Sequence, residues 1–374
     1  MADITNVTPP QELIYRLADR DNPDNMALTS FEEFRGYDDF VPVELVTSMT
    51  SKCLGSGETE IDALLEKRQT ELHDMSVQLL QIPANPVSPN LNPTGYVSDL
   101  TYLKRPIVVQ PVISAKRTIN LQEYAQADIS FDIVKKIEFA IAKEMLHGLG
   151  SLIKNVNTNL VTFLKAEASN NGGQGTFFPV TAPARRIPQA ETQAFKKIQV
   201  NCIQDKFPMT QGSKVKVLAS AEAMVMKNEY DELAAQNARN ASIQLAPFDF
   251  FPSNSISVDN AVTDESLLLV MHEGGAGIKY WTPPMYAPAG YETFDKTLSV
   301  MDVPAGLIGN SPAMRVGVYM DRDILNSFGA APFNTQMAYL NRTWNMIFFV
   351  FPVFFTPFST NPNHKAIVQY VRDI

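Results

Sequence analysis

The chain has 374 residues, of which 45% are hydrophobic and 19% are charged, with 25 prolines, 2 cysteines and 4 histidines. This composition excludes a disordered or collagen-like chain, and the length predicts about two or three domains. The net charge of -9 disfavours a protein that grips nucleic acid phosphates over its whole surface.

The first 95 residues carry most of the negative charge, because they contain 16 acidic and 6 basic residues. We interpret them as an N-terminal arm. Within it, apolar residues such as Ile61, Leu65, Leu72 and Leu79 recur mostly at three- and four-residue steps and predict a helix from about Glu58 to Gln81. The arm begins without an apolar signal segment, and Cys53 and Cys202 are expected to be free thiols in a reducing compartment.

Six prolines between Pro83 and Pro111 exclude a helix there and favour extended chain. The following stretch from Tyr96 to about Tyr124 is rich in Val, Ile and Tyr and predicts a long two-stranded hairpin, with the basic pairs Lys104-Arg105 and Lys116-Arg117 on its two strands. A projecting hairpin with so many apolar side chains is expected to be covered by another chain. The other interpretation is that this segment completes the subunit's own core.

A helix of about ten turns is predicted from Ser130 to about Ala168, because apolar residues form a helical stripe from Val134 to Leu164. Ser130 suits the N-cap, and Asn170 to Gly173 would end the helix. Gly148 and Gly150 lower the stability of this helix near its middle and allow a bend there.

The remaining chain predicts a mixed lobe of helices and strands. The predicted helices are Ala190 to Gln204 and one or two within Ser220 to Asn237. The predicted strands are Lys214 to Ala219, Ile256 to Val262, Leu267 to His272, Gly277 to Trp281, Met314 to Met320, Met346 to Phe355 and Ala366 to Tyr370. Pro352 argues that the Met346 run is not a regular sheet interior. The fold class is therefore α+β.

The sequence lacks the common motifs for catalysis or cofactor binding. It contains no GxxxxGK[ST], GxGxxG, HExxH or GxSxG pattern. His73, His147, His272 and His364 lie far apart, and structural roles are expected for them. Two long uncharged stretches, Met75 to Ser98 and Thr343 to Asn363, are interrupted by prolines and do not predict a membrane span. We therefore expect no catalytic, cofactor or metal site.

Apolar, uncharged stretches such as YWTPPMYAPAGY (residues 280 to 291) and the chain from Phe348 to Phe358 are typical of interfaces, or else complete the core. From these stretches and the hairpin we predict a set of contacts between subunits. The set is Tyr102, Lys104, Arg105, Ile107, Val109, Val112, Lys116, Arg117, Trp281 and Tyr286.

The order of these segments resembles the major capsid proteins of tailed double-stranded-DNA phages, whose fold is named after phage Hong Kong 97. The resemblance lies in YLKRPIVVQPVISAKRTINLQEY, then SFDIVKKIEFAIAKEMLHGLGSLIKNVNTNLVTFLKAE, and KVKVLASAEAMVMKN further on. It implies an N-terminal arm (1–95), an extended loop (96–128), a peripheral domain with a spine helix (129–205), an axial domain (206–330) and C-terminal strands that return to these domains (331–374).

The same resemblance implies a structural function without catalysis. Many copies would assemble through pentamers and hexamers into an icosahedral or prolate shell that encloses double-stranded DNA without sequence-specific binding. The implied partners are further copies, a portal, and scaffolding or decoration proteins, with no cofactor and no membrane. The implied location is the virion, after assembly in the bacterial cytoplasm. The alternatives are an encapsulin-like nanocompartment shell and an enzyme with a scattered active site.

Overall fold

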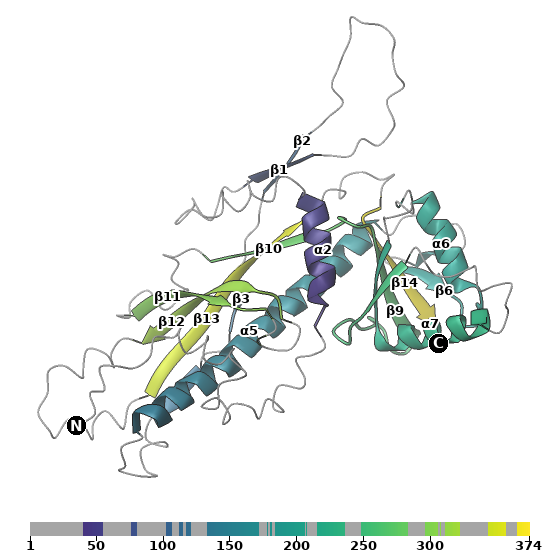
Figure 1. The fold of residues 1–374 in the computed structure, drawn as a ribbon. Helices are drawn as coiled ribbons and strands as arrows, with labels where there is room; N and C mark the ends of the chain where they lie inside the picture. The colour runs from purple at the N-terminus through teal and green to yellow at the C-terminus, as the bar shows by residue number, and fades with distance from the viewer. Residues whose placement is uncertain are drawn as a thin grey trace, which may run out of the picture.

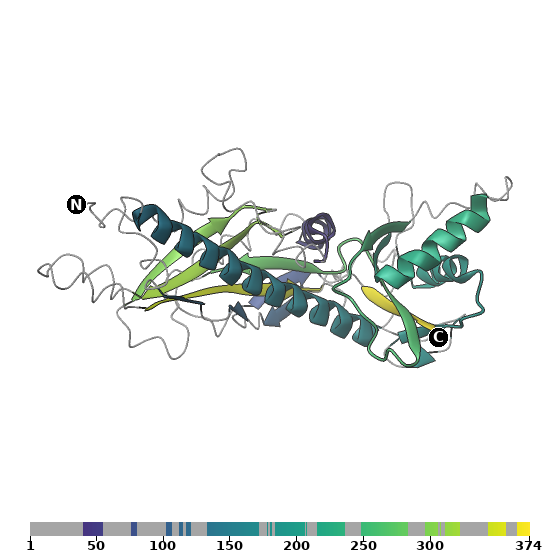
Figure 2. The ribbon, with the colours of Figure 1, turned by 90° about the horizontal axis from the view of Figure 1, so that it is seen from below.

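The structure is a computed structural model that describes residues 40–54, 76–80, 102–106, 112–114, 117–120, 133–171, 178, 180–181, 184–205, 207, 215–235, 248–282, 296–305, 307, 311–321, 343–356 and 365–374. These residues form an elongated body with two six-stranded sheets (Figure 1). One long helix, α5, runs beside the first sheet and reaches the second, as Figure 2 shows from below.

Helix α5 spans Ile133–Asn171, 39 residues, so it is about 58 Å long at about 1.5 Å per residue. The predicted apolar stripe is confirmed where side chains are described, because its members are buried at three- and four-residue steps: Met145, Leu149, Leu152, Val156, Leu160 and Leu164. The helix continues without interruption through Gly148 and Gly150.

The first sheet is built around β13 (Thr343–Phe355), the longest described strand. All of its neighbours are antiparallel to it: β10 (Gly277–Trp281), β12 (Met314–Asp321), β3 (Val112–Ile113) and β4 (Arg117–Asn120). Strand β12 also pairs with β11 (Lys296–Val303). The side chains from Met346 to Phe351 are all buried. The continuous apolar run is therefore part of the subunit's own core, the second of the two interpretations of this run.

Pro352 lies inside β13, opposite Tyr280 of β10. The pairing of β12 with β13 ends at Phe349 and that of β3 ends at Val350. Among the described strands, Pro352 thus has β10 as its one neighbour in register. A residue without an N–H group is tolerated at such a position. The prediction that Pro352 keeps the Met346 run out of a regular sheet interior is wrong, because β13 lies between β10 and β12 in the first sheet.

The second sheet has the strand order β5-β6-β14-β9-β7-β8. Its strands are β5 (Val180–Thr181), β6 (Ala184–Ile187), β14 (Ile367–Asp373), β9 (Asp264–Met271), β7 (Val215–Ala219) and β8 (Phe248–Pro252). Strand β14 is parallel to β6 and antiparallel to β9, while β7 is parallel to β8. The last strand of the chain therefore lies in the middle of this sheet.

Both faces of the second sheet are apolar, which explains the run Leu267–Met271. Leu267, Leu269 and Met271 pack into one core with α2 (Val43–Leu54) and the C-terminal half of α5. Leu268 and Val270 pack into a second core with α6 (Ala194–Gln204) and α7 (Ala221–Ala235). Successive side chains of a strand point to opposite faces, so a strand covered on both faces is apolar throughout.

Two of the predicted elements are wrong. Residues 76–80, within the predicted helix from Glu58 to Gln81, form the strand β1 (Ser76–Leu80), while residues 58–75 lie outside the described ones. Residues 256–262 form no strand, because Asn260 makes a turn: its side-chain Oδ1 accepts from the backbone N of Val262, and its carbonyl accepts from Asp264.

The predicted hairpin is also paired differently. Strand β2 (Tyr102–Pro106) pairs with β1, from Ser76 opposite Pro106 to Leu80 opposite Tyr102. Strands β3 and β4, the second half of the predicted hairpin, pair with β13 in the first sheet. The projecting ribbon is therefore β1–β2, and strands β3 and β4 help to complete the subunit's own sheet.

Each sheet combines strands that lie far apart in the sequence. The segment 206–330 contributes β7, β8 and β9 to the second sheet and β10, β11 and β12 to the sheet on α5. The segment 129–205 contributes β5 and β6 to the second sheet. The division of the chain into peripheral and axial domains stays a prediction.

Candidate assembly surfaces

The ribbon of β1 and β2 stands apart from both six-stranded sheets (Figure 1). Its two strands pair with each other over five residues each, and each has its main described contact with the other. The residues Tyr102, Lys104 and Arg105 lie in β2, opposite Leu80, Gln78 and Val77. An isolated two-stranded ribbon is marginally stable in water, so this one requires a further surface to pack against.

Two other predicted contact residues belong to the subunit's own sheet. Val112 in β3 lies opposite Val350 of β13. Next to it, the hydroxyl of Ser114 accepts a hydrogen bond from the backbone N of Phe348 at 3.0 Å. Arg117 in β4 donates from Nε to Oε2 of Glu144 on α5 at 2.9 Å. This ion pair ties the edge segment to the long helix within the subunit.

Trp281 is a core residue rather than an exposed contact. Its side chain is 6% exposed, and its ring lies 5.7 Å from that of Phe351. Strand β10 thus places the indole against β13 of its own chain, and a contact of Trp281 with a second copy stays a prediction. Ile107, Val109, Lys116 and Tyr286 lie outside the described residues.

Helix α2 was not predicted from the sequence, and it fastens the N-terminal part of the chain to the body. The hydroxyl of Thr50 accepts a hydrogen bond from the backbone N of Ile278 in β10 at 3.0 Å. Both groups are buried, and Leu45 and Met49 pack into the core beside α5. The spacing of Val41, Leu45 and Met49 at four-residue steps is the sequence signal that could have identified this helix.

The glycine turn EGGAG, residues 273–277, brings β10 against the end of α2. Gly274 has a φ of 85°, and a Cβ atom there would lie 3.0 Å from the backbone of Lys52. A Cβ on Gly277 would lie 3.2 Å from that of Cys53. The glycines therefore permit the left-handed turn and the close approach of two backbones.

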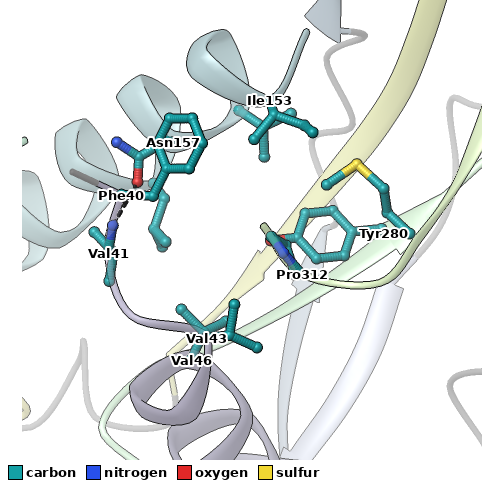
Figure 3. Close-up of a pocket in the computed structure, with 11 residues that line it drawn as sticks. Phe40, Val41, Val43, Val46, Ile153, Asn157, Tyr280 and Pro312 are labelled. Carbon is teal, nitrogen blue, oxygen red and sulfur yellow. Dashed lines mark hydrogen bonds between the residues drawn. The ribbon is translucent and has the colours of Figure 1, made fainter. Parts of the chain in front are cut away.

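A shallow apolar pocket lies between the start of α2, the middle of α5 and β10 (Figure 3). Phe40, Val43, Ile153 and Pro312 are among the residues that line it. A hydrogen bond between two of the lining residues, dashed in Figure 3, runs from the backbone N of Val41 to Oδ1 of Asn157 at 3.0 Å. The pocket's empty volume of about 320 Å³ is at the small end of ligand pockets, which span about 300 to 1,000 Å³. We interpret it as a packing seam between α2 and the body.

A buried cation, Arg185, holds the second sheet together at β6. Its guanidinium is 1% exposed and donates to both carboxylate oxygens of Asp205, at 2.7 and 3.1 Å, and to the hydroxyl of Tyr370 at 2.9 Å. Burial by itself would lower the pKa of Arg185, but the hydrogen bonds and charge of Asp205 outweigh it, so the pKa is raised. The charge is fully paired, as a buried ion requires.

Arg186, the next residue, bridges two carboxylates at the other side of the strand. It donates from Nη2 to Asp264 and from Nε to Asp373, both at 2.6 Å. Burial by itself would raise the pKa of the Asp264 carboxyl, but hydrogen bonds from Thr263 and Arg186 outweigh it and the pKa is lowered. These ion pairs link β6, β9 and β14 within the subunit.

The described residues give no support to catalytic or metal chemistry. No group of three or more His, Cys, Asp or Glu residues among them could hold a metal ion. Both cysteines are free thiols, and burial raises the pKa of Cys53 to about 12 and that of Cys202 still further, which disfavours the reactive thiolate. Nδ1 of His272 lies 2.6 Å from the backbone carbonyl oxygen of Glu273. None of the described helices is both long and apolar enough to cross a membrane.

No family model and no curated protein matches this chain by sequence. Solved structures that it resembles include a capsid of cyanophage P-SCSP1u, with 9% identity, 81% of this chain and 84% of that chain covered, and a TM-score of 0.43. A capsid of Ralstonia phage GP4 has 9% identity, coverages of 82% and 84%, and a TM-score of 0.38. A virus-like particle from Pyrococcus furiosus has 11% identity, coverages of 88% and 100%, and a TM-score of 0.34.

Proposed function

We propose that this protein is a major capsid protein that self-assembles into the closed shell around a double-stranded DNA genome and catalyses no reaction. The observation that carries this proposal is the β1–β2 ribbon, which stands off the body and pairs with itself. The ribbon of each copy would lie over a neighbouring copy, which would supply the surface that a two-stranded ribbon needs.

The rest of the described body suits the wall of a container. Its cores are closed by the subunit's own helices and strands, so the body is stable before assembly. Contacts between neighbours can then be individually weak, because each copy makes several of them in a closed symmetric assembly. The net charge of -9 fits a wall that encloses DNA without adhering to its phosphates.

In this proposal the protein resides in the virion, after assembly in the bacterial cytoplasm. Its partners are further copies in pentamers and hexamers, with portal and scaffolding or decoration proteins. The acidic residues before α2 would act as an arm that ties adjacent copies together. Helix α2 would hold the base of that arm on the body, through Thr50 and the glycine turn.

Deletion of the ribbon tests the proposal. Ser76 lies opposite Pro106, so residues 76–106 can be replaced by a short Gly-Ser linker without separating the flanking chain ends. We expect a folded subunit with unchanged thermal stability that forms no closed shells in negative-stain electron microscopy. Normal shells from this variant would refute the role of the ribbon.

A second deletion, of residues 112–120, is the matched control. It removes β3 and β4 from the sheet on α5, so we expect loss of folding rather than loss of assembly alone. The contents of wild-type particles separate the alternatives: DNA-filled shells support the capsid, shells loaded with enzyme support a nanocompartment, and a strictly monomeric protein at high concentration rejects both.

A further inference from the structure

Helix α6 has an exposed apolar face that its own subunit does not cover. Val200 is 37% exposed and Ile203 is 59% exposed. Lys196, one turn before Val200, is also exposed, so the three residues follow each other at steps of four and three on one face of the helix. The opposite face of α6, with Phe195, Ile198 and Cys202, is buried in the core.

Helix α7 has a matching exposed face of opposite charge. Val225 is 57% exposed, and it lies between the exposed residues Glu222 and Glu229 at steps of three and four. Oε2 of Glu229 also lies 3.9 Å from Nη1 of Arg372 in its own chain, so Glu222 is the freer of the two charges. Ala223 and Met226, on the other side of the helix, are buried in the same core as the inner face of α6. Both helices lie on the outer end of the body, away from α5 and β13 (Figures 1 and 2).

We propose that the α6 face of one copy (Lys196, Val200, Ile203) packs against the α7 face of a second copy (Glu222, Val225, Glu229). This inference rests on the proposed function and adds to that function a specific contact between neighbouring copies. Apolar side chains would form the centre of the contact, and the lysine and the glutamates would form a charged rim, as is usual at protein interfaces.

The charges decide which faces meet. An α6 face against another α6 face would bring Lys196 close to its own symmetry mate, and two α7 faces would bring four glutamates together. Pairing α6 with α7 places opposite charges side by side. Such a contact joins two different surfaces, so it propagates from copy to copy and closes into a ring when the rotation between copies allows it.

Charge reversal tests the pairing in the full-length protein. We expect Lys196→Glu and Glu222→Lys, each alone, to raise the protein concentration needed for assembly by roughly tenfold or more. The variant that carries both substitutions should assemble near the wild-type concentration, because the opposite charges face each other again. Failure of this rescue would overturn the pairing.

The apolar centre is tested with a matched pair of substitutions. Val225→Asp should abolish assembly at wild-type concentrations, whereas Val262→Asp should not, although Val262 is 83% exposed and lies in the turn before β9. Thermal unfolding of both variants should match the wild type, since both side chains are outside the cores. Assembly of Val225→Asp like the wild type, or equal loss in both variants, would contradict the proposed contact.

These outcomes are distinct from failure of the proposed function. If the wild-type protein forms no assembly under any condition, the shell function itself is rejected. If the wild type forms shells and the face variants form them equally well, only the contact between α6 and α7 is rejected.

Discussion

Gly148 of α5 lies so close to Phe348 of β13 that a Cβ atom on the glycine would lie 2.4 Å from Cε2 of the ring. The ring is fully buried. The glycine thus permits a close approach of the long helix to the longest strand, and its helix-weakening effect is the cost of that packing.

Gly148→Ala should destabilise the protein, although alanine is the better helix former by about 1 kcal/mol. The added methyl group would displace a buried ring, and overpacking of this kind costs about 1 to 3 kcal/mol. Urea unfolding of the two proteins measures the difference. Asn159→Ala, at an exposed position of α5, is the control and should be neutral or slightly stabilising. A gain in stability for Gly148→Ala would contradict the close packing.

Thr50→Val should loosen helix α2 from the body. Valine keeps the shape of threonine but leaves the buried N–H of Ile278 without the hydroxyl that accepts its hydrogen bond. We expect a loss of about 1 to 3 kcal/mol in the free energy of unfolding. Thr50→Ser keeps the hydroxyl and should lose less. Faster protease cleavage between α2 and β1 in the valine variant alone would identify α2 as the released element.

Asp205→Asn should destabilise strongly, because it leaves the charge of Arg185, which is 1% exposed, without its carboxylate. Breaking a buried pair from one side costs about 3 to 5 kcal/mol. Tyr370→Phe removes one hydrogen bond to the same guanidinium and should cost about 1 to 2 kcal/mol. Chemical denaturation would compare the two variants. A larger effect of the tyrosine substitution would show that the carboxylate is not the main partner.

Asp264 should make the protein sensitive to acid. Its pKa in the folded state is lowered, with hydrogen bonds from Thr263 and Arg186 outweighing burial, so its carboxylate stabilises the fold above the ordinary aspartate pKa of about 3.9. This contribution is lost as the pH falls from there through the lowered pKa. In thermal unfolding, the wild type should lose more stability than Asp264→Asn as the pH falls from about 5 to about 2. Equal losses would contradict this role of Asp264.

Local periodicity determined the elements that have one strong pattern. The stripe from Met145 to Leu164 predicts α5, and the apolar runs around Leu267, Met346 and Ile367 predict β9, β13 and β14, as the structure has them. The resemblance to phage capsid proteins rests on the order of these elements. Side-chain spacing alone fixes such features because helices and strands repeat their faces at 3.6 and 2 residues.

Partner choice was decided by tertiary structure. The residues around Tyr102 and those around Ile119 have the same apolar-basic composition, yet β2 pairs with β1 and β4 pairs with β13. A local sequence pattern does not determine which distant strand will form hydrogen bonds with a given segment. For the same reason, the burial of Trp281 against Phe351 could not be predicted from the sequence. Strand pairing depends on contacts between segments far apart in sequence, so only the folded chain determines which apolar segments are core and which stand free for a neighbour.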